Sequence, residues 1–135
     1  MTGVAKVAQL ALRGSGILVL LLGLSLWAGH GYSLLQLHTL LGVIVVLALW
    51  TLAALAAKAG APLIPVTRAV LWGFIVLALG MTQTQLFPGS LHWVIRVIHL
   101  LVGVGAMVQG ERLARFALGA PARDAAGPAA PRAPA

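Results

Sequence analysis

Two histidines in apolar surroundings are the residues of this chain best suited to chemistry. His38 lies in the window 37–43 and His99 in the window 98–104, and the two windows align without a gap. Each window places a glycine, Gly42 or Gly103, four residues after its histidine. A neutral imidazole is a common ligand for transition metals. A fainter match between residues 19–23 and 76–80 extends the similarity, so the sequence predicts a repeated helical hairpin with one potential ligand in each copy.

A cation accompanies the second histidine. His92, Arg96 and His99 are spaced i, i+4 and i+7, so they share one face of a helix. Arg96 stands in an otherwise apolar stretch, and an ionisable group inside a membrane segment is costly and usually marks a site with a partner. The two acidic residues, Glu111 and Asp124, lie toward the other side of the membrane, so we expect an anion from outside the chain, such as the carboxylate of a bound cofactor, beside Arg96.

The composition excludes a water-soluble protein. The chain has 135 residues, of which 61% are hydrophobic and 8% are charged, against about 45–50% and about 25% in soluble domains. The absence of cysteine excludes a disulfide framework, a thiolate metal site and covalent c-type haem attachment. The basic residues occur singly among apolar runs, which is not the pattern of a protein that binds nucleic acid. The sequence therefore predicts a protein embedded in a lipid bilayer.

Four segments are apolar and long enough to cross a membrane as helices, which takes about 20 residues. They span residues 14–30, 33–57, 66–86 and 90–113, and turn-forming glycine and proline residues separate them. Ser90, after Pro88 and Gly89, is expected to cap the fourth helix. Such short connections make neighbouring helices antiparallel. We expect an all-α, up-down-up-down four-helix transmembrane bundle built from two repeated helical hairpins.

The basic residues predict the orientation in the cytoplasmic (inner) membrane. Arg96 is near one side, and the other bases lie on the side of the termini and of the middle connection: Lys6, Arg13, Lys58, Arg68, Arg112, Arg115, Arg123 and Arg132. The positive-inside rule therefore places both termini in the cytoplasm. We expect residues 1–13 to form a cytoplasmic N-terminal segment, residues 14–118 the transmembrane domain and residues 119–135 a disordered cytoplasmic tail. An aromatic belt is expected at the outer boundary, formed by Trp27, Tyr32, Phe87 and Trp93.

The second and fourth helices lie on a diagonal of such a bundle, so His38 and His99 are expected to face each other at similar depth. Two facing imidazoles can supply both axial ligands of one haem iron. Gly42 and Gly103, one turn deeper on the same faces, would leave a flat surface for the edge of a porphyrin. Gly105 is expected to add room nearby.

These features resemble those of small membrane-bound b-type cytochromes, such as cytochrome b561-like proteins and each half of haem A synthase. The resemblance covers residues 14–113 and rests on few residues, namely His38, Gly42, Arg96, His99 and Gly103. Many such cytochromes have two histidine pairs at opposite faces, whereas all four histidines of this chain lie toward one face. The resemblance implies haem b as the cofactor, and the departure from the two-pair pattern predicts a single haem near the extracytoplasmic face. It also implies electron transfer, with electrons from a quinol or within a larger respiratory complex, rather than a stand-alone enzyme.

Several alternatives remain open at this point. His30 and His92, at the interface, are candidates for a second haem, for proton transfer from a quinol, or for a zinc or copper site together with His38 and His99. Polar residues near the outer face are either solvated helix ends or a quinone head-group site: Gln36, Thr82, Gln83, Thr84 and Gln85. Other glycines are assigned to close helix packing: Gly14, Gly16, Gly23, Gly73 and Gly80. The competing function is a haem-free accessory subunit of a larger membrane complex.

Overall fold

The computed structural model describes residues 2–119, and nearly all of them are helical. The four long helices are α1 (Thr2–Trp27), α2 (Leu35–Lys58), α3 (Leu63–Thr82) and α4 (His92–Ala117). Two single 3-10 turns, η1 (Tyr32–Leu34) and η2 (Gly89–Leu91), precede α2 and α4. Each long helix is long and apolar enough to span a membrane. The prediction of an all-α chain with four membrane-length helices is confirmed.

The first helix begins at Thr2 rather than at Gly14. Lys6 and Arg13 interrupt the apolar pattern, so hydropathy alone places the start too late. The intervening residues are mainly good helix formers such as alanine, leucine, lysine and glutamine. Three of them, Ala5, Ala8 and Leu12, are buried along one face of α1. Residues 2–13 therefore form part of α1. The predicted tail, apart from Gly119, lies outside the described residues.

Other helix ends also differ from expectation by a few residues. Ser90 does not cap α4, because it lies within η2 and the helix begins after Leu91 without a side-chain cap. The third helix ends at Thr82 instead of residue 86, where backbone turns from Gln85 to Thr82 and from Leu86 to Gln83 replace the helical pattern. The predicted glycine turns are present. Gly29, with φ 84°, adopts the left-handed conformation that glycine accepts without strain.

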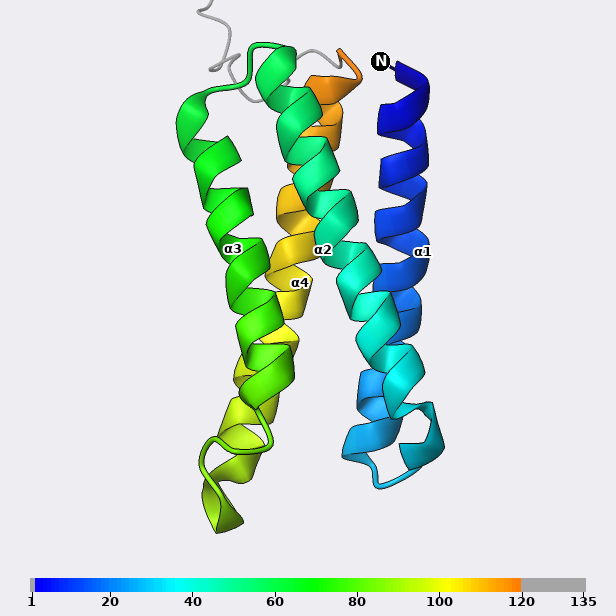
Figure 1. Ribbon diagram of the computed structural model, residues 1–135, viewed down its shortest axis with the longest axis vertical. Coiled ribbons are helices and arrows are strands. Elements are labelled where there is room, and N and C mark those ends of the chain that lie inside the picture. The colour runs from blue at the N-terminus through cyan, green and yellow to red at the C-terminus, as the bar shows by residue number, and fades with distance from the viewer. Residues whose placement is uncertain (1, 120–135) are drawn as a thin grey trace, which may run out of the picture.

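The helices are arranged so that those carrying the two histidines are neighbours. In Figure 1 the α1–α2 and α3–α4 connections lie at one end, and the α2–α3 connection lies at the other end with the N-terminus. Helices α2 and α4 pack against each other, and each also packs against α1 and α3. The pair α2–α4 therefore forms the inner diagonal of the bundle.

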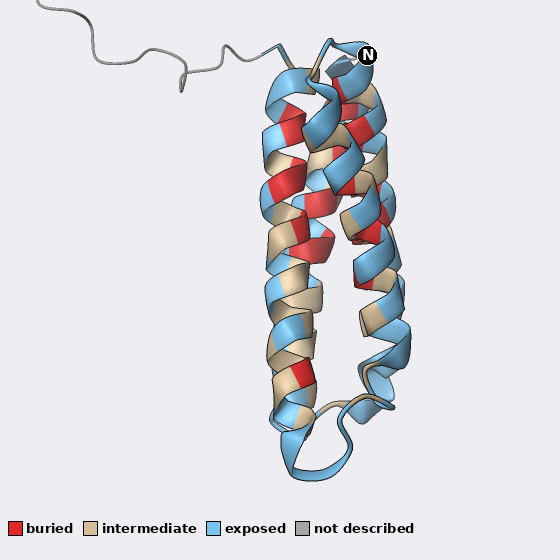
Figure 2. Ribbon diagram, turned by 90° about the vertical axis from the view of Figure 1, so that its left-hand side faces the viewer, coloured by how far each residue is buried: buried red, intermediate tan, exposed pale blue. Residues whose placement is uncertain are grey.

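The apolar core occupies one half of the bundle. Buried residues concentrate toward the end that holds the N-terminus and the α2–α3 connection (Figure 2). They include Leu12, Leu49, Leu52 and Leu113, which are at most 2% exposed. In the opposite half, only Val76 and Ile95 are buried among the described residues. The histidines lie in this second half, where protein side chains alone form no comparable core.

Two tryptophans hold neighbouring helices together within the core. The indole Nε1 of Trp50 donates a hydrogen bond to the carbonyl oxygen of Val70 at 3.1 Å, and the ring lies directly against Gly73. Trp72 repeats this arrangement one helix further on, where Nε1 donates to the carbonyl oxygen of Val102 at 2.8 Å. Its ring lies against Gly105, where an added Cβ would be 2.9 Å from it. The expected free space beside Gly105 is therefore occupied by Trp72.

The packing role assigned to the other glycines holds for most of them. An added Cβ on Gly16 would be 2.6 Å from the Met107 side chain, so α1 and α4 approach closely there. Gly14 was assigned the same role, and this was wrong, because an added Cβ would meet nothing within 4 Å.

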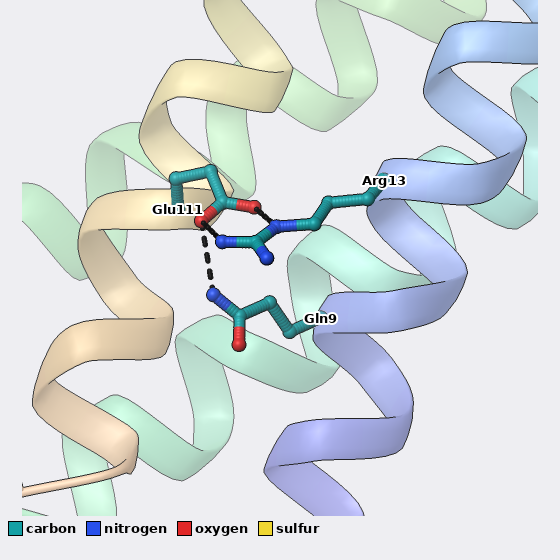
Figure 3. A network of polar contacts seen from close by, with 3 residues as sticks. All are labelled: Gln9, Arg13 and Glu111. Atoms are coloured by element: carbon teal, nitrogen blue, oxygen red, sulfur yellow. Dashed lines mark hydrogen bonds and ion pairs between the residues drawn. The ribbon is translucent and has the colours of Figure 1, made fainter.

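A polar cluster ties α1 to α4 at the end away from the histidines (Figure 3). Arg13 donates two hydrogen bonds to Glu111, from Nε to Oε1 at 2.6 Å and from Nη2 to Oε2 at 2.7 Å. Gln9 Nε2 donates a third to Oε2 at 2.9 Å. A bidentate arginine–carboxylate pair fixes geometry as well as charge. Glu111, the one acidic side chain that the structure describes, is therefore already paired.

Candidate cofactor site

His38 and His99 are brought together between α2 and α4, in the half of the bundle away from the apolar core. Their ring centroids are 6.3 Å apart and their planes make an angle of 47°. Both side chains are half-buried. Because α2 and α4 are direct neighbours, the two imidazoles meet from opposite helices at matching depth, as the two aligned windows predict.

The spacing of the rings suits one metal ion between them. An imidazole nitrogen binds a metal at about 2 Å, and the ring centre lies about 1 Å beyond it, so two opposed imidazoles have centres about 6 Å apart. The observed separation is 6.3 Å. Two such rings share only the axis through the metal, so the angle between their planes is not fixed by coordination. The pair therefore fits the two axial ligands of a haem iron.

The hydrogen bonding of the two rings tests whether these histidines serve only to stabilise helix packing. The Nδ1 atoms of His38 and His99 are buried and have no hydrogen-bond partner among residues 2–119. Buried polar atoms in proteins are nearly always paired, so two unpaired ones need an explanation. A histidine that only stabilised helix packing would be expected to form a hydrogen bond across helices. The unpaired atoms argue against a role in packing alone, and the ring separation is what points to a pair of ligands.

Each ring rests on a glycine of the preceding helix. A Cβ added to Gly23 on α1 would be 3.1 Å from Cε1 of His38, and one added to Gly80 on α3 would be 3.7 Å from Cε1 of His99. Sequence reasoning assigned both glycines only to helix packing. The signal that could have identified them was the match between residues 19–23 and 76–80, which ends on these glycines. Gly23 and Gly80 therefore belong to the site.

Gly42 and Gly103 border open space. A Cβ added to either residue would have no neighbour within 4 Å, although both residues are half-buried. They lie one turn from His38 and His99 on the same helix faces. This is the arrangement expected if a flat group lies against the backbone at these positions.

We predict that Gly42→Leu and Gly103→Leu weaken haem binding at least about tenfold, as changes around a metal centre commonly do. The larger side chains would occupy the space that the macrocycle needs. The free energy of unfolding of the cofactor-free protein should stay unchanged or rise, because no neighbour is displaced and leucine favours the helix. Haem titration and detergent unfolding of the same variants separate the two effects. Unchanged haem affinity in both variants would remove these glycines from the site.

Arg96 supplies an unpaired cation next to the histidine pair. It is half-buried on α4, one turn from His99, and makes no ion pair or hydrogen bond within residues 2–119. Glu111, on the same helix, is bound to Arg13 and lies about 22 Å along the helix axis from Arg96. An anionic group from outside the chain would satisfy this guanidinium. Arg96 is therefore the residue that would hold an acidic group of a cofactor bound by the histidine pair.

The other two histidines lie apart from the pair. His30 is exposed in the α1–α2 connection, and Nδ1 of His92 lies 3.2 Å from the carbonyl oxygen of Leu86. The part of the chain that the structure describes contains no group of three or more histidine, cysteine, aspartate or glutamate residues able to hold a metal. The four histidines therefore do not assemble the zinc or copper site considered from the sequence.

The polar residues considered for a quinone form no connected cluster. The Thr82 hydroxyl donates to the carbonyl oxygen of Ala78 at 2.7 Å, within its own helix. Gln36, Thr84 and Gln85 are exposed. Their positions match solvated helix ends at least as well as a binding site.

Comparison with known proteins finds no family model, no curated protein and no solved structure that matches the chain significantly. The geometry of the histidine pair is therefore the basis for the function proposed below.

Proposed function

We propose that this chain is a membrane-bound b-type cytochrome that transfers electrons through a single haem bound by His38 and His99. The observation that carries the proposal is the 6.3 Å separation of two imidazoles from facing helices. The unpaired Nδ1 atoms support it, and so does the scarcity of buried apolar residues in the half of the bundle that holds the histidines. A prosthetic group would supply the packing that the side chains do not.

The residues of the site have separable roles. His38 and His99 hold the iron from opposite helices, and Gly23 and Gly80 let the rings lie close to α1 and α3. Arg96 offsets the negative charge of the propionates. When bound, the haem supplies a centre that accepts and donates one electron. If His38 and His99 both held the iron, no ligand position would remain for oxygen, and the group would supply one-electron transfer alone.

We further propose that the helices form two repeated hairpins in an up-down-up-down bundle across the cytoplasmic membrane, with both termini in the cytoplasm. The equivalent contacts of His38 with Gly23 and of His99 with Gly80 support the repeat. The exposed aromatic residues at the end of the α1–α2 and α3–α4 connections are typical of a membrane boundary: Trp27, Tyr32, Phe87 and Trp93. In this orientation the haem lies toward the extracytoplasmic face. Its electron partner is then a quinol or a redox protein of a larger respiratory complex.

The proposal is tested by titrating the full-length chain in detergent with ferric haem. We expect one haem to bind per chain, with a sharp Soret band that shifts on reduction with dithionite. His30→Ala and His92→Ala serve as controls and should bind haem as the unaltered chain does. A stable, folded chain that stays colourless would overturn the proposal and favour the haem-free accessory subunit.

A further inference from the structure

An apolar groove that includes one cationic residue, Arg68, runs along α3, away from the histidine pair. It has a volume of about 520 Å³ and extends from Leu63 to Ile75, which is about 18 Å along a helix axis. The part from Arg68 to Ile75 is about 10 Å long, which lies within the depth of one leaflet of the bilayer hydrocarbon, about 15 Å. Its apolar lining is largely exposed and consists of Leu63, Ile64, Leu71, Trp72 and Ile75.

Arg68 lines this groove, and its guanidinium is held in place from α4. Its Nε donates to Oε1 of Gln109 at 3.2 Å, and Gln109 is a buried residue. The Nη groups of Arg68 make no hydrogen bond within residues 2–119, and Glu111 is already bound to Arg13. Four N–H donors of Arg68 are therefore available to an external acceptor.

The hydroxyl beside Arg68 is also free. Threonines inside membrane helices commonly donate to the carbonyl oxygen four residues earlier. Thr39, Thr51 and Thr82 do so in this protein, at 2.7–3.0 Å. Thr67, which lines the groove, makes no such bond in the described part of the chain. A hydroxyl and a guanidinium that line the same groove are suited to the oxygens of a phosphate group.

We propose that this groove binds an anionic phospholipid. The phosphate is held by Arg68 and Thr67, and an acyl chain lies along Leu71, Trp72 and Ile75. The occupant is anionic because no acidic side chain of the described residues balances Arg68, and apolar because the rest of the lining offers no polar group. This site is independent of the proposed haem and goes beyond electron transfer.

Trp72 provides a fluorescent probe inside the groove. The full-length chain is placed in phosphatidylcholine vesicles that contain a small fraction of phosphatidylglycerol with brominated acyl chains, which quench tryptophan on contact. Brominated phosphatidylcholine at the same fraction is the reference. We expect stronger quenching by the anionic lipid, and we expect Trp72→Phe to remove this excess while quenching of the other tryptophans remains.

Charge variants test the role of Arg68. One basic residue near a membrane surface changes the preference for anionic lipid about fivefold, so Arg68→Gln should lower it by about that factor. Arg68→Lys should keep most of the preference. Arg112→Gln is the matched control, since it removes the same charge from an exposed residue outside the groove, and it should behave as the unaltered chain.

Two results would overturn the site. Equal quenching by the two brominated lipids would mean that ordinary bilayer lipid covers α3. An equal loss of the preference for anionic lipid in Arg68→Gln and Arg112→Gln would mean that the net charge of +7 attracts this lipid without a defined site.

Discussion

Replacement of His38 or His99 by alanine is expected to abolish stable haem binding. Each variant loses one of the two iron ligands that the ring separation of 6.3 Å brings together. Changes to residues that only support a metal ligand cost about 10- to 100-fold in affinity, so loss of a ligand should cost more than about 100-fold. Haem titration followed by absorption spectroscopy measures this loss.

Stability measurements show whether such a loss is specific. The buried Nδ1 atoms of His38 and His99 form no hydrogen bonds, so alanine breaks none at these atoms. We expect the cofactor-free variants to unfold at the same detergent or denaturant concentration as the unaltered chain. Unfolding of His38→Ala or His99→Ala under conditions where the unaltered chain is folded would instead assign these rings to packing.

The largest effect on stability is expected for Gly73→Ala. The added Cβ would collide with the indole of Trp50, a rigid ring already held by its hydrogen bond to Val70. Displacing this ring strains the core and weakens that hydrogen bond. Overpacking and a weakened hydrogen bond together correspond to about 2–3 kcal/mol of unfolding free energy.

Gly14→Ala is the matched control, because it makes the same change at a position where the added Cβ meets nothing within 4 Å. Alanine favours a helix over glycine by about 1 kcal/mol, so this variant should be as stable as the unaltered chain or more so. Equilibrium unfolding in mixed micelles compares the two. Equal stability of both variants would contradict the close contact between α2 and α3.

Hydropathy and segment length were sufficient to predict four membrane-length helices, because long apolar runs have no stable alternative to a helix in a bilayer. The same criterion misplaced the start of α1. Lys6 and Arg13 lower local hydropathy, but they do not interrupt a helix whose buried face is formed by Ala5, Ala8 and Leu12. Burial along one face, rather than mean hydropathy, sets this boundary.

The pairing of His38 with His99 could be predicted because the aligned windows give both residues the same depth and the same helix face. Contacts of these windows with the other helices could not be predicted. Gly23 and Gly80 precede the histidine windows in the chain, and only the packing of α1 on α2 and of α3 on α4 places them beneath the rings. The same limit explains Gly105, whose neighbouring space is filled by Trp72 from another helix.

Electron paramagnetic resonance of the ferric, haem-loaded protein tests most directly whether two imidazoles share one iron. We expect a low-spin signal of the bis-imidazole type in the unaltered chain. The signal should give way to a high-spin form, or disappear with the haem, in His38→Ala and in His99→Ala. A low-spin signal that persists in both variants, or a high-spin signal in the unaltered chain, would contradict ligation by this pair.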